Sequence, residues 1–398
     1  MKDILVVAGA RTPMAEYNGA FRNITEIDLG AIAARGALER SGLAPSAVDH
    51  IVFGNALQTS GQAIYGARHV GLKAGLRVET PALTVNRICA SGIQAIVTAG
   101  QMIRLDEAER VIAGGMENLS QAPHVIRGLR SGLRLGEGRL EDLFMVALMD
   151  EIAGLLMAGT ADLLGKRAGI TRQDADGYAF RSQRAAQAAF AAGKMDDEIV
   201  PVEVPVRGGT RIVREDDHRR PDATPEALAA LPPVFGTELV TAGNASGIVD
   251  GAAAVAVTSA RAAAELSVRP LGRVVSWAFV GVEPRLMGIG PAPAIRLALE
   301  RASLRLEDID LFEINEAFAA QYLAVERELG LDRDRVNVNG GAIAIGHPLA
   351  ATGTRLVLTL LLELRRRAGR YGVASACIGG GQGGAIVVES TPRQGGAG

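Results

Sequence analysis

Residues 37–43 read ALERSGL and residues 298–304 read ALERASL, so nearly the same stretch occurs twice in the chain. A second pair keeps the same spacing: CASGIQAIVTAG begins at Cys89, and AATGTRLVLTLL begins at Ala350. Strand-like runs that end in asparagine, IVFGN and LFEIN, follow the first pair with one residue of slip. Similar segments in the same order and at one spacing indicate a duplicated structural unit.

The repeats predict two copies of one fold unit, residues 1–119 and 269–398, with the first completed by about residues 248–268. In both copies, runs rich in Val and Ile alternate with alanine-rich helical stretches, which is typical of helices layered on mixed sheet. Residues 120–247 have no counterpart and contain a helical stretch at 171–193. An insertion of this kind often builds a binding site. The predicted fold is therefore α/β, with two similar layered α/β/α halves and an inserted loop domain.

Composition excludes several classes of protein. The 398 residues carry a formal net charge of −2, so no basic excess points to nucleic acid. No run of 18 apolar residues occurs, and residues 1–9 do not read as a secretory signal, so we expect neither a membrane span nor export. Two cysteines without such a signal argue against a disulfide framework. These observations predict a cytoplasmic protein.

The two copies differ where chemistry could take place. The first copy has Cys89 where the second has Ala350, and Cys377 has a methionine as its counterpart. His347 lies three residues before the position equivalent to Cys89. If the copies pack about a pseudo-twofold axis, their equivalent loops face each other. Cys89, His347, Cys377 and Asn315 would then meet at one site.

Each of these side chains also has a plain structural interpretation. Cys89 stands between a strand-like run and a helix, where the helix dipole should lower the pKa of its thiol, but a free cysteine is often a small buried hydrophobe. His347 follows GGAIAIG and precedes a proline, which would present the imidazole rigidly, but a lone histidine is commonly structural. The glycines after Cys377 could offer N–H groups to an anion.

Together, a thiol, an imidazole, an amide side chain and glycine N–H groups suit acyl transfer through a thioester. The second thiol could remove a proton beside a thioester carbonyl, which would make or break a carbon–carbon bond. Two other classes remain open. Cys89, Cys377 and His347 could be zinc ligands, although they lack the close paired spacing of structural zinc sites. A non-catalytic acyl-CoA-binding protein would keep the glycines but lose the reactive groups.

At the level of whole motifs the chain resembles the thiolases, which include acetyl-CoA acetyltransferases and 3-ketoacyl-CoA thiolases, along essentially its full length. The resemblance rests on VNRICASGIQAI, GGMENLSQAP, TAGNASGIVDGAAA, LMGIGP, NEAFAAQ, GGAIAIGHP and CIGGGQGG, in family order. It implies the duplicated thiolase fold and an acyltransferase that catalyses reversible Claisen condensation of acetyl-CoA and thiolysis of 3-ketoacyl-CoA, a reaction of fatty acid metabolism. It also implies a homo-oligomer, a dimer or a tetramer. Coenzyme A and acyl-CoA would be substrates, with no cofactor and no metal.

The resemblance also implies a role for individual residues. Cys89 would carry the acyl group, His347 would activate it, and Cys377 would transfer the α-proton. Asn315, through a water, would join His347 in holding the enolate oxygen, and the N–H groups of Cys89 and Gly379 would hold the acyl carbonyl oxygen. The remaining family positions would line the path of coenzyme A and the acyl pocket: Ser246, Arg220, Leu148, Met157, Phe235, Ala242, Met287, Ala317 and Phe318.

Some positions depart from the family pattern. Ala350 stands where glycine is usual, and Asp162 and Leu163 replace Glu and Asn. Leu156 stands where many short-chain members have histidine, which leaves the acyl-chain preference open. A decarboxylating ketoacyl synthase would share the fold but needs a second histidine, and Asn315 follows LFEI here. The sequence does not set the physiological direction of the reaction.

Overall fold

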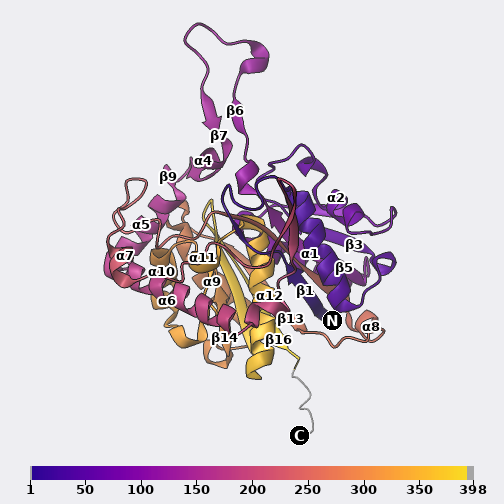
Figure 1. Cartoon of the computed structure of the whole chain (residues 1–398). Helices are drawn as coiled ribbons and strands as arrows, with labels where there is room; N and C mark the ends of the chain where they lie inside the picture. The colour runs from indigo at the N-terminus through magenta and orange to yellow at the C-terminus, as the bar shows by residue number, and fades with distance from the viewer. Residues whose placement is uncertain (1, 392–398) are drawn as a thin grey trace.

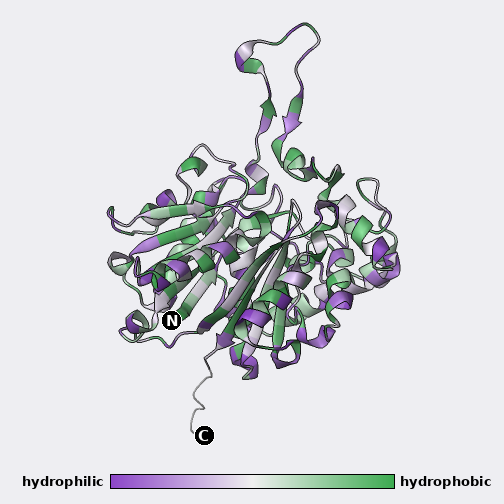
Figure 2. Cartoon of the chain, turned by 180° about the vertical axis from the view of Figure 1, so that it is seen from behind, coloured by the Kyte–Doolittle hydropathy of each residue, from purple (hydrophilic) through white to green (hydrophobic). Residues whose placement is uncertain are grey.

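The computed structural model describes residues 2–391, and its centre is a ten-stranded mixed sheet. In spatial order the strands are β14 (Leu311–Ile314), β15 (Tyr371–Ile378), β16 (Gln382–Ser390), β13 (Gly272–Gly281), β1 (Ile4–Arg11), β12 (Val249–Ser259), β5 (Arg110–Glu117), β3 (His50–Gly54) and β4 (Ala82–Val85), with β2 (Ala15–Glu16) paired to β12. Figure 2 shows these strands mostly in green or pale tones, while purple residues are frequent along the outer helices.

The strand order repeats on the two sides of the β1–β13 pair. From β1 outward it runs β12, β5, β3, and from β13 outward it runs β16, β15, β14. The β3–β5 and β14–β15 pairs are parallel, and the other pairs in both series are antiparallel. The predicted α/β fold with a duplicated unit is confirmed by this topology. The exact boundaries between the units stay a prediction.

Two long helices form a central layer between the two halves: α3 (Ser91–Arg104) and α12 (Leu349–Arg367). They are the repeated segments that begin at Cys89 and Ala350. Their apolar side chains share one buried cluster with strands of both halves. The backbones approach closely, because a Cβ atom on Gly92 would lie 2.3 Å from the Thr354 nitrogen. A larger residue at position 92 would separate the helices.

Outer helices cover the opposite faces. The first half is covered by α1 (Glu26–Ser41) and α2 (Gly66–Lys73), and the second by α9 (Pro291–Ala302) and α10 (Ala319–Leu329). The ALERSGL and ALERASL repeats are the ends of α1 and α9. Both helices end in a left-handed residue, Gly42 at φ 67° and Ser303 at φ 55°. Figure 1 shows the indigo first half and the orange-to-yellow second half side by side.

Segment 120–247, which has no counterpart in the repeat, lies across both halves. Its elements are β6 (His124–Ile126), β7 (Leu140–Asp142), α4 (Leu143–Ala147), β8 (Met149–Asp150), β9 (Leu155–Leu156), α5 (Met157–Arg167), α6 (Arg172–Ala191), β10 (Val202–Val206), β11 (Gly209–Val213) and α7 (Pro225–Ala229). The helix expected at 171–193 is α6, which begins with a capping box between Thr171 and Asp174. The β6–β7 ribbon projects away from the body of the molecule (Figures 1 and 2). Two short helices complete the core, α8 (Ala260–Ala263) and α11 (Ala342–Ile345).

Short 3-10 turns join these elements. They occupy Pro45–Ala47, Ala63–Tyr65, Ile88–Ala90, Leu119–Gln121, Leu129–Ser131, Lys194–Asp197, Pro284–Ile289, Leu306–Asp308 and Arg333–Arg335. The turn Ile88–Ala90 is the one that leads directly into α3.

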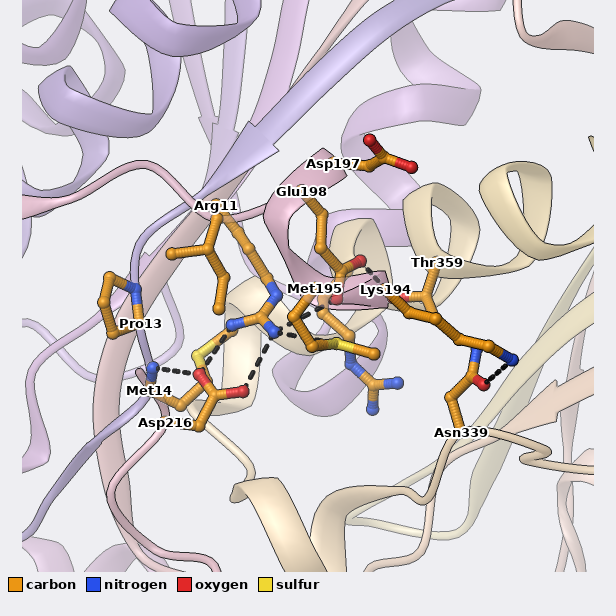
Figure 3. A network of polar contacts seen from close by, with 12 residues as sticks. Arg11, Pro13, Met14, Lys194, Met195, Asp197, Glu198, Asp216, Asn339 and Thr359 are labelled. Carbon is orange, nitrogen blue, oxygen red and sulfur yellow. Dashed lines mark hydrogen bonds and ion pairs between the residues drawn. The ribbon is translucent and has the colours of Figure 1, made fainter. Parts of the chain in front are cut away.

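A buried polar network attaches segment 120–247 to both halves (Figure 3). Arg11 of β1 donates to both carboxylate oxygens of Asp216, at 2.6 and 2.9 Å, and to Glu198 at 3.0 Å. Glu198 also accepts a hydrogen bond from Thr359 of α12 at 2.7 Å. Because Arg11 and both carboxylates are almost fully buried, removal of one partner would leave an uncompensated charge. The network therefore fixes the inserted segment over the two halves.

Candidate active site

One cavity of about 530 Å³ is lined by both halves and by segment 120–247. Cys89, His347 and Cys377 all lie in its wall. Cys89 comes from the first half, and the other two come from the second. The structure thus brings together the three reactive side chains singled out from the sequence, at equivalent ends of the duplicated units.

Cys89 lies in the turn Ile88–Ala90, immediately before α3. Ile88 has φ 46°, a conformation that is costly for a β-branched residue. The surrounding turn holds it there: the Arg87 nitrogen donates to Ser91 Oγ at 2.8 Å, and Ser91 Oγ donates to the Ile88 carbonyl at 2.7 Å. A strained residue directly before a cysteine at the wall of a cavity is typical of a functional position.

The protonation state of Cys89 differs from the sequence expectation. Burial raises the pKa of the Cys89 thiol to about 12, although the N–H groups of Gly379 and of Cys89 itself oppose the rise. The expected lowering by the helix dipole is therefore wrong for the resting site, because desolvation of the thiolate outweighs the dipole and the two N–H groups. The negative charge of Glu117 adds to the rise. The resting group is a neutral thiol that needs a base.

His347 follows Gly346, whose φ of 96° favours glycine. The His347 nitrogen donates to the Gly247 carbonyl at 2.9 Å. Its ring contacts Thr352 Oγ1 through Nδ1 at 2.6 Å, and Asn315 Nδ2 lies 3.3 Å from Nε2. With Asn315 as donor, Nε2 is the acceptor and the ring proton lies on Nδ1. The imidazole is thus held by contacts on both ring nitrogens.

Burial, assisted by the positive charge of Arg355, lowers the pKa of His347 to about 3. The imidazole is therefore neutral at physiological pH and able to accept a proton. A neutral histidine and a neutral cysteine in the wall of one cavity form a proton-acceptor and proton-donor pair. Neither group carries its charge until a reaction moves the proton.

Cys377 lies near the end of β15 and is fully buried. Burial and the nearby Cys89 hold the pKa of its thiol well above the usual range. It packs with Met287 and Ala317 in a small apolar cluster. Asn315 follows β14, and its backbone nitrogen donates to the Ser375 carbonyl at 2.9 Å. Its Oδ1 is buried without a partner among the described residues, so it can accept a hydrogen bond.

Most of the other predicted residues also line the cavity. These are Gly379, Ser246, Leu148, Met157, Phe235, Met287, Ala317 and Phe318. Asn315 reaches the site only through its contact with His347. Arg220 and Ala242 are not in the wall: Arg220 pairs with Glu16 at 3.0 Å and is half exposed, and Ala242 lies on an exposed loop.

Sequence reasoning missed several residues of the wall. Apolar examples are Leu57, Leu119, Phe144, Met145, Ile248 and Leu349. In the sequence these side chains have the same pattern as ordinary core residues. Phe144 and Met145 also lie within residues 129–150, which follow the family motifs only loosely. Motif recognition therefore identified the polar groups of the site more completely than its apolar wall.

The described residues also bear on a metal site and on a membrane span. Within residues 2–391, no three histidine, cysteine, aspartate or glutamate side chains come together in an arrangement that could hold a metal ion. In the same part of the chain, no helix combines the length and apolarity needed to cross a membrane.

Two family models match almost the whole chain. Residues 4–261 match the family described as Thiolase, N-terminal domain, and residues 268–390 match Thiolase, C-terminal domain. The two matched regions meet between β12 and β13 and together include every residue of the cavity wall.

Individual relatives are similar over almost their full length. The human protein named 3-ketoacyl-CoA thiolase, mitochondrial, is 49% identical over 98% of this chain and 99% of its own. Its crystal structure superimposes with a TM-score of 0.96, and a structure of that human protein in complex with CoA gives the same score. A protein named acetyl-CoA acetyltransferase from Cupriavidus necator is 47% identical over 98% of this chain and 100% of its own.

Proposed function

This chain belongs to the thiolase family, and we propose that Cys89 carries the acyl group, with His347 as its base and Cys377 as the acid and base toward carbon. The protein is an acyltransferase that moves an acyl group between coenzyme A and an acyl-CoA. Its reaction is Claisen condensation in one direction and thiolysis of a 3-ketoacyl-CoA in the other. The convergence of two thiols and one imidazole in a single apolar cavity carries the assignment of roles.

Acyl transfer begins at the neutral thiol. His347 Nε2 takes the proton of Cys89 as the sulfur attacks the thioester carbonyl, so that no free thiolate has to form in the cavity. The carbonyl oxygen becomes negative in that step. The N–H groups of Gly379 and Cys89, which point toward the thiol, are suited to stabilise it. The product is an acyl group on Cys89, and coenzyme A leaves with the proton.

Carbon–carbon bond formation requires a second base. Cys377 first gives its proton to His347 Nε2, and the thiolate formed in this way removes the α-proton of a second acetyl-CoA, so that the negative charge moves to the enolate oxygen. Asn315 Nδ2, which lies 3.3 Å from His347 Nε2, and the now protonated Nε2 itself are the donors proposed to hold that oxygen. The enolate carbon then attacks the acyl group on Cys89, and the Cys89 sulfur leaves and takes the proton back from His347. Thiolysis is the same sequence reversed.

Labelling distinguishes the two cysteines. Incubation with acetyl-CoA is expected to place one acetyl group on Cys89, detected by peptide mass spectrometry. Because burial raises the pKa of this thiol to about 12, its alkylation by iodoacetamide should quicken about tenfold per pH unit between pH 7 and pH 10. Cys89→Ser is the matched control and should take no label. An acetyl group found on Cys377 instead would reverse the assignment.

Acyl-chain preference follows from the wall of the cavity. Leu156, Met157 and Met287 give it apolar and flexible side chains, and we propose that it accepts acyl chains longer than four carbons. Each additional methylene that fits contributes up to about 0.8 kcal/mol, or about fourfold in kcat/KM. Leu156→His is expected to lower kcat/KM for a six-carbon 3-ketoacyl-CoA more than for acetoacetyl-CoA. Leu155→His, next to the cavity but outside its wall, is the control. Absence of turnover with the six-carbon substrate would contradict the proposal.

Further properties are part of the same proposal. We propose that coenzyme A and acyl-CoA act as substrates without another cofactor, since the thiols, imidazole and N–H groups supply nucleophile, base and oxyanion stabilisation. A dimer or tetramer is supported by β4, an edge strand of the sheet on which Leu83 is exposed, and by the exposed Tyr65. The cytoplasmic location expected from the sequence stays a proposal, because the relatives include proteins named as mitochondrial. Ser246 in the cavity wall and the exposed Arg220 are proposed to contact coenzyme A.

A further inference from the structure

Glu117, the last residue of β5, is fully buried and accepts four hydrogen bonds from N–H groups. Asn55 Nδ2 and the Leu57 nitrogen lie 2.9 Å from its Oε1. The nitrogens of Ala56 and Ala350 lie 3.1 Å from its Oε2. The first three donors belong to the loop after β3 in the first half, and Ala350 belongs to α12 in the second. One carboxylate therefore joins the two halves.

Each side of this junction leads to a reactive group. Ala350 lies in the first turn of α12, three residues after His347. On the other side, the Ala56 carbonyl accepts from Asn86 Nδ2 at 3.0 Å, and Asn86 Oδ1 accepts from the Ile88 nitrogen at 2.9 Å. Ile88 is the strained residue before Cys89. Glu117 is thus connected to the Cys89 turn and, separately, to the start of the helix that follows His347.

The close packing of α12 on β5 leaves Ala350 little room to move. A Cβ atom on Gly115, two residues before Glu117 in β5, would lie 2.0 Å from the Ala350 carbonyl oxygen. The first turn of α12 is therefore seated directly on β5, and Glu117 holds its nitrogen at the same place. Loss of the carboxylate would leave several buried donors unpaired, which favours local displacement.

We propose that Glu117 is a positioning residue that sets the placement of Cys89 relative to His347 by binding both halves through one carboxylate. The proposal rests on the roles given above to Cys89 and His347. Glu117 is not in the cavity wall and acts through the loop and the helix. All four partners donate, so the carboxylate form is the one that satisfies them.

The charge of Glu117 should also affect the acidity of the Cys89 thiol. Two ionisable groups face Glu117, which are Glu26 from α1 and Cys89 from its turn, and both interact with it by repulsion when ionised. Burial raises the pKa of Glu117 to about 8, and the N–H donors oppose the rise, so Glu117 carries its full charge only at alkaline pH, in the range where Cys89 alkylation is followed. The negative charge of Glu117 disfavours the Cys89 thiolate. An amide at position 117 would remove this repulsion and make the Cys89 thiol more acidic, even though it would disturb the geometry needed for turnover.

The test compares Glu117→Gln and Glu117→Asp in the full-length protein. In Glu117→Gln we expect kcat for thiolysis of acetoacetyl-CoA to fall about 10- to 100-fold, because misplacement of reacting groups by about 1 Å has effects of this size. KM for coenzyme A should stay within about threefold. The pH profile of Cys89 alkylation should move to lower pH. In Glu117→Asp, which keeps the charge but is shorter, kcat should fall while the alkylation profile keeps its position.

Glu26→Gln is the matched control. Glu26 is also a fully buried glutamate and accepts from Ser60 Oγ at 2.6 Å and Thr59 Oγ1 at 3.2 Å, hydroxyls that can donate to an amide oxygen. We expect its kcat to stay within about twofold of the parent.

Three results would overturn the proposal. The first is a kcat within about threefold of the parent in both Glu117 variants. The second is an unmoved alkylation profile in Glu117→Gln. The third is failure of both variants to fold, which would make Glu117 a residue of the fold rather than of the site. Acetyl labelling of Cys89 in the unchanged protein tests the proposed function separately, so each idea can fail without the other.

Discussion

His347→Ala is expected to lower turnover at least about 10³-fold while coenzyme A binding stays nearly intact. General-base assistance is worth about 10²–10⁴-fold, and an oxyanion donor about 10²–10³-fold. His347 would supply both, in steps that share transition states, so the two losses should not simply add. The geometry supports this expectation, because Nε2 faces Asn315 and burial lowers the pKa of the ring to about 3, so that a neutral acceptor is present.

If His347 had only a structural role, a different result would be expected. His347→Ala would then have a lower melting temperature, with nearly full activity in the folded fraction. His347→Asn should recover little activity, since an amide can donate a hydrogen bond but cannot take the thiol proton. His50→Ala is the matched control, because His50 lies at the start of β3, outside the cavity wall, with its ring Nδ1 3.1 Å from the Ile51 carbonyl. Melting temperature and turnover measured on the same samples decide between the two interpretations. Near-normal turnover in folded His347→Ala would end the catalytic assignment.

The sequence predicted most of the fold because duplication leaves a readable pattern. ALERSGL and ALERASL proved to be the matching ends of α1 and α9, and the segments from Cys89 and Ala350 proved to be α3 and α12. The helix expected at 171–193 is α6. The course of residues 129–150 could not be predicted, because no repeat or strong periodicity marks the β6–β7 ribbon or the cavity-lining residues that follow it.

The residues that meet at the cavity could also be predicted from the sequence, but the pKa values of their side chains could not. A thiol at a helix start suggests a low pKa, and the opposite holds for the partly exposed Cys89, because desolvation by the surrounding packing outweighs the N–H groups of the turn. Burial depends on segments distant in sequence. The same reason hides the positive φ of Ile88, which local preferences disfavour and only the surrounding turn enforces. Arg220 and Ala242 fall outside the cavity wall for a related reason. A match to a family motif does not show how far the loop that carries the residue lies from the cavity.

Cys377→Ala is expected to lower both thiolysis and condensation by about 10²–10⁴-fold, the usual contribution of a general acid or base. The reason is the buried place of Cys377 in the cavity wall, which keeps its thiol protonated. Cys377 is fully buried beside Met287 and Ala317, and burial together with Cys89 holds the pKa of its thiol above the usual range. The resting group therefore carries the proton that thiolysis must deliver to carbon. Acetylation of Cys89 does not need that proton, so labelling by acetyl-CoA should remain near one group per chain.

This separation of two half-reactions is what distinguishes a second catalytic thiol from a packing residue. A cysteine needed only for packing would affect labelling and turnover together, because both require an intact cavity. Cys377→Ser provides a near-isosteric comparison: its hydroxyl is a much weaker acid than a thiol and should exchange protons with carbon poorly, so turnover should stay low although the cavity stays filled. Met116→Leu, at the equivalent place in β5 by the repeat, is the control for core packing and should leave turnover nearly unchanged. If Cys377→Ala lost acetyl labelling in parallel with turnover, or if Cys377→Ser kept full activity, Cys377 could not be the group that moves the α-proton.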